Sequence, residues 1–277
     1  MRLGGPLFEN SPHAQSWITA VQRSGYRAAY CPVDAKTEPA AAQEYVDAAR
    51  HADIVIAEVG AWSNPISPDA ETRRAAIERC KEQLALADRI GARCCVNIAG
   101  SRGARWDGPH PDNFAEDTFD QIVETVRDIL DSVQPTRTFY ALETMPWIFP
   151  DSPDSYLRLI AAIDRPRFAV HLDPVNMISS PARFFRNGDF IKECFSKLGR
   201  YIKTCHAKDI ALSDRLTVHL DEVRPGLGDL DYGTFLRELN RLDPDIPLML
   251  EHLPGEEEYR LAAAHIRSVA REEGLQL

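Results

Sequence analysis

Residues 139–173 read FYALETMPWIFPDSPDSYLRLIAAIDRPRFAVHLD, and this stretch decides the fold. Its two short apolar runs, Phe139–Thr144 and Phe168–Asp173, have the length and the aromatic and β-branched content that are typical of β-strands. Between them, Ser152 and Pro153 form a capping residue followed by a proline, which is a typical start of an α-helix. The stretch is therefore a strand–helix–strand unit, and we expect its two strands to be parallel.

The same alternation of an apolar run and a helical pattern continues along the whole chain. The eight predicted strands are Leu3–Phe8, Tyr26–Tyr30, Asp53–Val59, Cys94–Ala99, Phe139–Thr144, Phe168–Asp173, Ile202–His206 and Pro247–Glu251. The segment Asp69–Ile90 illustrates the helical pattern, because its apolar residues recur at intervals of three or four. Ser11–Pro12 marks another helix start, and Gly25, Gly91 and Gly199 lie where helices should end. The sequence thus predicts eight strand–helix units.

We expect these units to form a single α/β domain over residues 1–277, a closed (β/α)₈ TIM barrel. No linker rich in proline, glycine or serine divides the chain, and barrels of about 250 residues commonly form one domain. The runs are almost continuously apolar, as parallel strands buried on both faces should be. The first strand-to-helix turn, Phe8–Pro12, has no glycine-rich phosphate loop, which favours a barrel over an open doubly wound sheet.

The composition limits the classes of partner. The 42 acidic and 32 basic side chains give a formal charge of −10, which argues against a nucleic-acid backbone or an anionic membrane surface as the main partner. No run approaches the ~20 apolar residues of a membrane span, and Met1–Pro6 lacks the apolar core of a signal peptide. We therefore expect a cytoplasmic protein that acts on a small molecule.

Four of the predicted strands end in a side chain that can bind a metal ion. These side chains are Glu143, Asp173, His206 and Glu251, and the gaps between them are 30, 33 and 45 residues. A barrel of eight units in this chain averages about 35 residues per unit, so the four residues should lie at matching heights on successive strands. Three carboxylates and one imidazole suit a divalent cation such as Mn²⁺, Mg²⁺, Co²⁺ or Zn²⁺.

With this quartet, the chain resembles the xylose isomerase-like TIM barrels, which include sugar isomerases, keto-sugar 3-epimerases, inosose dehydratases and endonuclease IV. The resemblance also rests on Glu58–Trp62, Ile90–Ala92, His206–Asp209 and Gly226–Tyr232. It implies a barrel that binds a divalent metal ion, and Mn²⁺ is the expected ion among the four candidates. Endonuclease IV needs several more histidines than this chain offers at its strand ends, so DNA repair is excluded.

In the epimerases that this chain resembles, the equivalents of Glu143 and Glu251 bind the metal and also move protons, one on each face of the sugar. The resemblance therefore implies catalytic roles for Glu143 and Glu251. A divalent cation polarises a carbonyl and the adjacent hydroxyl, which acidifies the C–H between them. We thus expect isomerisation or epimerisation of a sugar or keto-sugar through an enediolate.

Several further side chains are candidates for contacting the substrate. They are Trp62, Arg102, His110, Trp147, His171, Asn176 and Lys208. The tryptophans could stack on a sugar ring or form a hydrophobic lid, and Arg102 and His110 lie in the long loop after the fourth strand. Asn176 occupies the position where the epimerases usually have a histidine. Near the histidine of the seventh strand, where the epimerases tend to have an arginine, this chain has Lys208. His252 should point outward, because side chains alternate along a strand.

Two other functions stay open on the sequence alone. The first is a lyase that performs β-elimination next to a ketone, like inosose dehydratase or the barrel subunit of a 3-oxo-glycoside deglycosidase. The second is a metal-free barrel that serves as a binding or assembly subunit. In each case the expected ligand is a carbohydrate or cyclitol. The phenylalanines of the segment Phe184–Leu198 fit either a homo- or hetero-oligomer interface or a helix that packs on the barrel.

Overall fold

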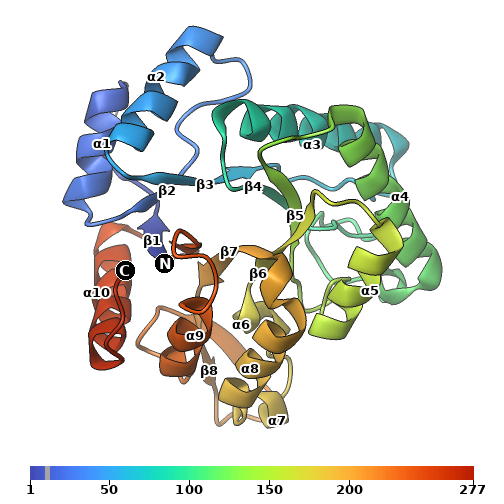
Figure 1. Ribbon diagram of the computed structural model, residues 1–277. Helices are drawn as coiled ribbons and strands as arrows, with labels where there is room; N and C mark the ends of the chain where they lie inside the picture. Colours follow the sequence, from blue (N-terminus) through green and yellow to red (C-terminus); the bar gives the residue numbers. More distant parts are fainter. Residues whose placement is uncertain (10–12) are drawn as a thin grey trace.

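The barrel closes from eight parallel strands. In the computed structural model, which describes residues 1–9 and 13–277, the strands follow the order β1-β10-β7-β6-β5-β4-β3-β2 around the barrel, with helices outside it (Figure 1). The strands are β1 (Arg2–Gly5), β2 (Ala28–Tyr30), β3 (Val55–Gly60), β4 (Cys94–Asn97), β5 (Phe139–Glu143), β6 (Phe168–Leu172), β7 (Ile202–Ala207) and β10 (Pro247–Leu250). The predicted (β/α)₈ fold is confirmed, and each predicted run overlaps one strand.

The longer helices of the described residues cover the outside of the barrel, whereas the short helix after β6 lies at its carboxyl end. The helices are α1 (Ala14–Arg23), α2 (Pro39–His51), α3 (Ala70–Ile90), α4 (Glu116–Val133), α5 (Pro153–Ile163), α6 (Pro174–Met177), α7 (Pro181–Phe184), α8 (Asn187–Leu198), α9 (Tyr232–Leu239) and α10 (Glu256–Glu272), with 3₁₀ turns η1 (Pro111–Phe114) and η2 (Gly199–Tyr201). None of these helices is both long and apolar enough to cross a membrane.

The helix ends follow the local chemistry of the chain. Ser152 caps α5 by accepting a hydrogen bond from the N–H of Ser155, as its sequence predicted. Asp69 caps α3 in the same way, and Gly91 ends that helix in the left-handed conformation, with φ of 70°. The predicted helix start at Ser11–Pro12 lies outside the described residues.

Small residues let the strands close around a packed interior. A Cβ atom at Gly4 would lie 2.4 Å from the carbonyl oxygen of Ala28 on β2 and 2.6 Å from the sulfur of Met249 on β10. Both neighbours flank β1 in the barrel, so a side chain at this position would force them apart. The barrel interior is thus filled by side chains, which leaves its carboxyl end for a site.

The phenylalanines of the segment 184–198 divide between the core and the surface. Phe184 in α7 and both Phe190 and Phe195 in α8 are buried, whereas Phe185 is 73% exposed. Helix packing therefore accounts for three of the four aromatic side chains.

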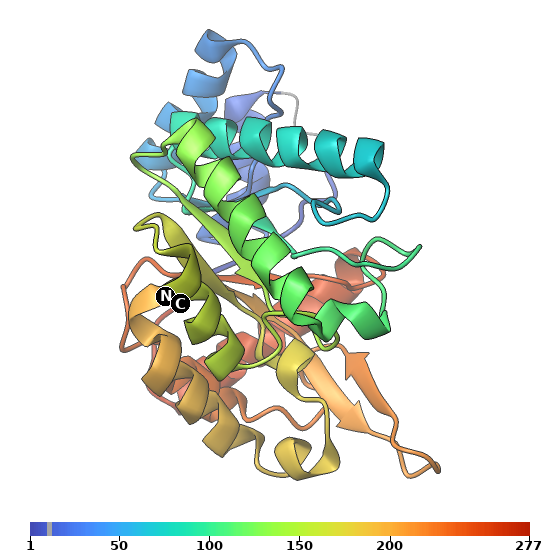
Figure 2. The same cartoon turned by 90° about the vertical axis from the view of Figure 1, so that its right-hand side faces the viewer.

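A two-stranded hairpin projects from the carboxyl end of the barrel directly after β7, at the lower right of Figure 2. Its strands, β8 (Asp209–Leu212) and β9 (Leu220–Val223), are antiparallel, and Ile210 pairs with Glu222. This hairpin was not predicted from the sequence. It turns the chain back so that Glu222 reaches the end of β7.

Asp209 anchors the base of this hairpin. Its buried carboxylate accepts hydrogen bonds from the backbone N–H groups of Ile210, Gly226, Gly228 and Leu230, at 2.8 to 3.1 Å. The glycine at 228 is required there, because a Cβ would lie 2.5 Å from the carboxylate oxygen. One side chain therefore folds the segment that leads to α9 against the end of β7.

We expect Asp209→Asn to destabilise the protein. The asparagine amide keeps one acceptor oxygen, but it turns its NH₂ group toward backbone N–H donors. Those buried donors lose their hydrogen-bond acceptor, at a cost of roughly 1–3 kcal/mol each. Urea unfolding followed by circular dichroism should give a lower midpoint. The exposed Asp221 on β9 supplies the control, Asp221→Asn, and equal midpoints for the two variants would contradict the anchoring role.

Candidate metal centre and substrate cavity

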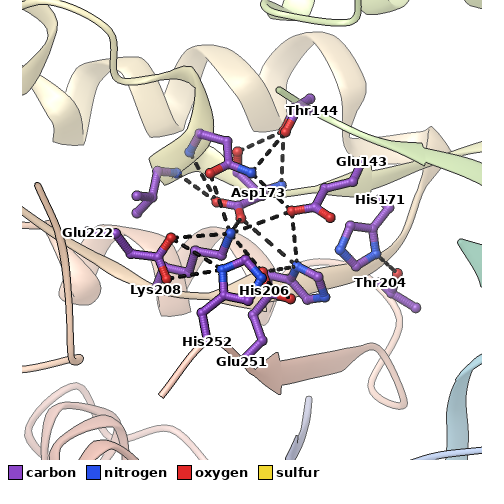
Figure 3. Close-up of polar contacts among 12 residues, drawn as sticks. Glu143, Thr144, His171, Asp173, Thr204, His206, Lys208, Glu222, Glu251 and His252 are labelled. Carbon is purple, nitrogen blue, oxygen red and sulfur yellow. Dashed lines mark hydrogen bonds and ion pairs between the residues drawn. The ribbon is translucent and has the colours of Figure 1, made fainter. Parts of the chain in front are cut away.

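Four side chains converge at the carboxyl end of the barrel because their strands are neighbours. Glu143 ends β5, Asp173 follows β6, His206 lies in β7 and Glu251 follows β10, and these strands are adjacent in the barrel. One potential ligand atom from each lies within 4.8 Å of the other three (Figure 3). The Nδ1 atom of His206 is 3.3 Å from Glu143 Oε1 and 2.7 Å from Glu251 Oε1. The structure thus brings together the complete predicted quartet.

The chemistry of this donor set fits a divalent metal ion. Asp173 and His206 are fully buried, and Glu143 and Glu251 are nearly so. Three carboxylate groups and one imidazole nitrogen are ligands for hard or borderline divalent cations. Buried carboxylates also require a compensating positive charge, because desolvating an unpaired anion is costly. Glu143, Asp173, His206 and Glu251 can therefore hold such an ion.

Burial and neighbouring charges shift the pKa values of the quartet in opposite directions. Burial raises the pKa of Asp173 to about 6, against the pull of the Lys208 and His206 charges. For Glu251, burial is outweighed by His206 and Lys208, so its pKa lies below the ordinary value. Burial alone would lower the pKa of His206, but the surrounding carboxylates raise it well above the usual range. The excess of carboxylates thus favours cations at this centre.

Lys208 lies inside the site rather than at the surface. Its ammonium group is 2.8 Å from Asp173 Oδ2 and 2.7 Å from Glu251 Oε1, and its side chain is 1% exposed. It also lies 3.6 Å from Glu143 Oε1 and 3.6 Å from Glu222 Oε2. These carboxylates outweigh the effect of burial and raise the pKa of Lys208 well above its ordinary value, so the amine stays charged.

Asn176 orients two of the carboxylates. Its side-chain Nδ2 donates hydrogen bonds to Glu143 Oε1 and to the carbonyl oxygen of Thr144, both at 3.0 Å. Its backbone N–H, with that of Val175, donates to Asp173 Oδ1, which leaves Asp173 Oδ2 facing Lys208. Asn176 therefore holds Glu143 in place from the start of α6.

Glu58 is a buried carboxylate that the sequence analysis did not select as a site residue. It lies in β3 with Oε2 3.5 Å from His206 Nε2 and Oε1 3.6 Å from His171 Nδ1. Burial raises its pKa. If Nδ1 of His206 is to bind a cation, Nε2 must carry the proton, and Glu58 is the carboxylate placed to accept it. The sequence signals were a glutamate inside an apolar run and its place in the segment Glu58–Trp62, on which the family resemblance partly rests.

The remaining predicted substrate contacts divide into two groups. Trp62, Trp147, Asn176 and Lys208 line a cavity of about 730 Å³ above the quartet, whereas Arg102, His110 and His171 do not. Arg102 donates to the side chain of Gln121, and His110 accepts from the N–H of Asp112 at the start of η1. His171 lies beneath the quartet and bonds to the Thr204 hydroxyl. These three residues therefore lie outside the lining of the cavity.

His252 lines the cavity, contrary to the outward direction expected from strand alternation. The reason is that β10 ends at Leu250 and His252 adopts a left-handed backbone with φ of 58°. Its Nδ1 atom lies 3.3 Å from Glu222 Oε1 of the hairpin. The polar wall of the cavity therefore consists of Glu143, Asn176, Lys208, Glu222, Glu251 and His252.

Comparisons with known proteins agree with this architecture. Residues 18–269 match the family described as Xylose isomerase-like TIM barrel. The chain belongs to this family. No curated protein matches its sequence.

Solved structures share the whole fold at low sequence identity. D-psicose 3-epimerase from Clostridium cellulolyticum H10, in complex with D-tagatose, has a TM-score of 0.69 and 14% identity, with 100% of both chains covered. A probable 3-DHS dehydratase from Bacillus anthracis has a TM-score of 0.66 and 18% identity, covering 92% of this chain and 93% of its own. A xylose isomerase-like protein from Mycobacterium smegmatis, in complex with magnesium, has a TM-score of 0.67 and 15% identity, covering 98% and 95%.

We expect the purified protein to bind about one divalent ion per chain, and Asp173→Asn to weaken that binding at least about tenfold, because it removes a charged ligand. Calorimetric titration of the metal-stripped protein with Mn²⁺ measures the affinity, and elemental analysis after dialysis measures the stoichiometry. Asp189→Asn, on the exposed face of α8, is the matched control. Equal affinities in the wild type and both variants would contradict the assignment.

Glu58 should matter through the orientation of His206. We expect Glu58→Leu to weaken Mn²⁺ binding by about 10–100-fold, the usual cost of removing a group that orients a ligand. Glu58→Gln keeps an acceptor for the imidazole N–H and should restore most of the affinity. Nitrogen chemical shifts of His206 report which ring nitrogen is protonated. An unchanged ring tautomer in Glu58→Leu, together with wild-type affinity, would refute this role.

Proposed function

We propose that the protein is a metal-dependent enzyme that isomerises or epimerises a sugar or keto-sugar through an enediolate intermediate. One observation carries this proposal: Glu143 and Glu251 line the same cavity from β5 and β10, and Asp173 and His206 are buried between them at the ends of β6 and β7. Two carboxylates that reach one cavity from different strands are what proton transfer at both faces of a carbon requires.

A divalent ion held by Glu143, Asp173, His206 and Glu251 would polarise a carbonyl and its neighbouring hydroxyl, which makes the C–H between them more acidic. We propose Mn²⁺ as this ion, with Mg²⁺, Co²⁺ and Zn²⁺ as alternatives that suit the same donors.

The residues of the chain then carry the proton. Glu143 accepts it on one side of the sugar carbon and Glu251 returns a proton on the other side, which inverts the carbon. For isomerisation, one carboxylate moves the proton between neighbouring carbons. The hydrogen bond from Asn176 fixes Glu143 for this transfer. The Lys208 ammonium, charged and close to both carboxylates, stabilises negative charge that develops on the substrate oxygens.

A lyase that eliminates a group from the carbon next to the enolised position is the second candidate. The pair of His252 and Glu222 on the cavity wall favours it, because a leaving oxygen needs a proton as it departs and an imidazolium can supply one. The product distinguishes the two reactions. Isomerisation conserves the substrate mass, whereas elimination lowers it by water or by a larger leaving group.

We expect Glu143→Gln and Glu251→Gln each to slow solvent deuterium incorporation into a reactive ketose by at least about 100-fold, since each removes a proton-transfer group. Incubation of the Mn²⁺-loaded protein with ketoses and inososes in D₂O, followed by proton spectroscopy and mass measurement, gives both the rate and the reaction class. Glu257→Gln on the exposed start of α10 should behave as wild type. Wild-type exchange in both cavity variants at full metal occupancy would rule out their proposed roles.

A further inference from the structure

The cavity above the quartet has a polar half and an apolar half. Most of the polar side chains come from the arc of the barrel formed by β5, β6, β7, β10 and the hairpin, and the loop after β4 adds the ion pair of Arg105 and Asp107. The opposite arc, from β2 to β5, contributes Tyr30, Trp62, Ile98, Trp106, Met145 and Trp147. Three tryptophans therefore face one side of a space whose other side carries the carboxylates.

The apolar half is held in place by contacts of its own. The indole N–H of Trp147 donates to the carbonyl oxygen of Asp107 at 2.8 Å, which ties two loops together. The Asp107 carboxylate lies 2.7 Å from Arg105. Trp62 lies over Gly60, where a Cβ would come within 2.4 Å of the indole nitrogen. These contacts build a wall before any ligand arrives, as is usual for small-molecule sites.

Large aromatic surfaces are nevertheless left open to the cavity. Trp62 is 38% exposed and Trp106 is 40% exposed, although both line a recess rather than the outer surface. Exposed aromatic faces in a preformed recess are typical of ligand sites, because a ligand completes their burial.

Tyr30, Arg105 and Asp107 supply polar atoms to this half, and these are already engaged with partners in the protein. The Tyr30 hydroxyl donates to the carbonyl oxygen of Leu250 at 3.0 Å, and Arg105 and Asp107 pair with each other. Among the described residues, the indole N–H groups of Trp62 and Trp106 and the exposed Arg105 guanidinium are the main groups left to bind sugar hydroxyls here, and all of them are donors. Most hydroxyl groups of a second sugar ring would therefore exchange water for no new hydrogen bond, which is unfavourable. A flat apolar ring needs no such partners and gains stacking contacts with indole faces. The wall thus favours an aromatic group over a second sugar.

The volume of the cavity agrees with a ligand of two parts. At about 730 Å³ it falls within the roughly 300–1,000 Å³ of sites that enclose drug-sized molecules. A single sugar ring placed against Glu143 and Glu251 leaves the tryptophan side unfilled.

We infer that the substrate is a glycoside: a sugar ring bound at the carboxylate half, joined to an aromatic group that stacks in the apolar half on Trp62 and Trp106. The sugar half of this inference rests on the proposed function. The aromatic half rests on the apolar arc alone and can be tested without any reaction.

The test compares the binding of phenyl β-glucoside and methyl β-glucoside, which lack a carbonyl and therefore cannot enolise. Calorimetry on the Mn²⁺-loaded protein should show the phenyl compound binding about tenfold more tightly, the gain expected for one aromatic stacking contact. Methyl cellobioside, which carries a second sugar in place of the phenyl ring, should bind no better than methyl β-glucoside.

Variants assign the preference to the tryptophans. Trp62→Ala and Trp106→Ala should each reduce the phenyl preference to about twofold while the affinity for methyl β-glucoside stays unchanged, because each removes stacking surface only. Trp62→Phe should retain part of the preference. Phe185→Ala, at an aromatic side chain that is 73% exposed and does not line the cavity, is the control and should bind as wild type.

Two results would overturn the inference: equal affinities for the phenyl and methyl compounds, or a preference that survives in both alanine variants. Tighter binding of methyl cellobioside than of phenyl β-glucoside would also overturn it, in favour of a disaccharide. A failure of the proposed function is distinguishable from a failure of this inference, because deuterium exchange with keto-sugars would then be absent while the phenyl preference remained.

Discussion

The buried negative charge at the carboxyl end of the barrel is the constraint to which the rest of this site responds. Glu143, Asp173 and Glu251 end three strands within one arc, and all three are largely shielded from water. Anions in such a place need positive partners, because desolvation makes an unpaired charge costly. The Lys208 ammonium supplies part of that charge, and the donor atoms of the quartet lie close enough together that they could hold a divalent cation.

Contacts with neighbouring residues hold the side chains of the quartet in fixed orientations. Asn176 binds Glu143, the N–H groups at the start of α6 bind Asp173, and Glu58 faces the far side of His206. Proton transfer is sensitive to small errors of position, so a base held by several contacts is more effective than a mobile one. The packed barrel interior provides the rigid base that these contacts need.

Two kinds of side chain lie at the carboxyl end of the barrel. Strands from β5 to β10 carry the carboxylates and the lysine, whereas the loops after β3, β4 and β5 carry tryptophans. Each strand end can vary without changing the scaffold, which is why this fold supports many reactions. The hairpin of β8 and β9 adds Glu222 to the polar side and so closes it near His252.

The sequence by itself determined the barrel and its quartet. Eight apolar runs separated by helical segments leave few alternatives to a (β/α)₈ fold, and regular spacing places strand-end residues at one level. The resemblance to the epimerases singled out Lys208 and Asn176, which lie two and three residues after the strand-end residues His206 and Asp173. Arg102, His110 and His171 show the limit of sequence reasoning, because a loop or strand position does not reveal which side chain turns into the cavity.

Only the tertiary structure decided the contacts that depend on distant segments or on one backbone angle. Glu58 becomes a partner of His206 because β3 and β7 lie across the barrel from each other, a relation that local pattern does not encode. His252 enters the cavity through a single left-handed residue, and Glu222 arrives on a hairpin. Strand pattern fixes which residues lie at the end of a barrel, whereas loop geometry fixes which of them meet.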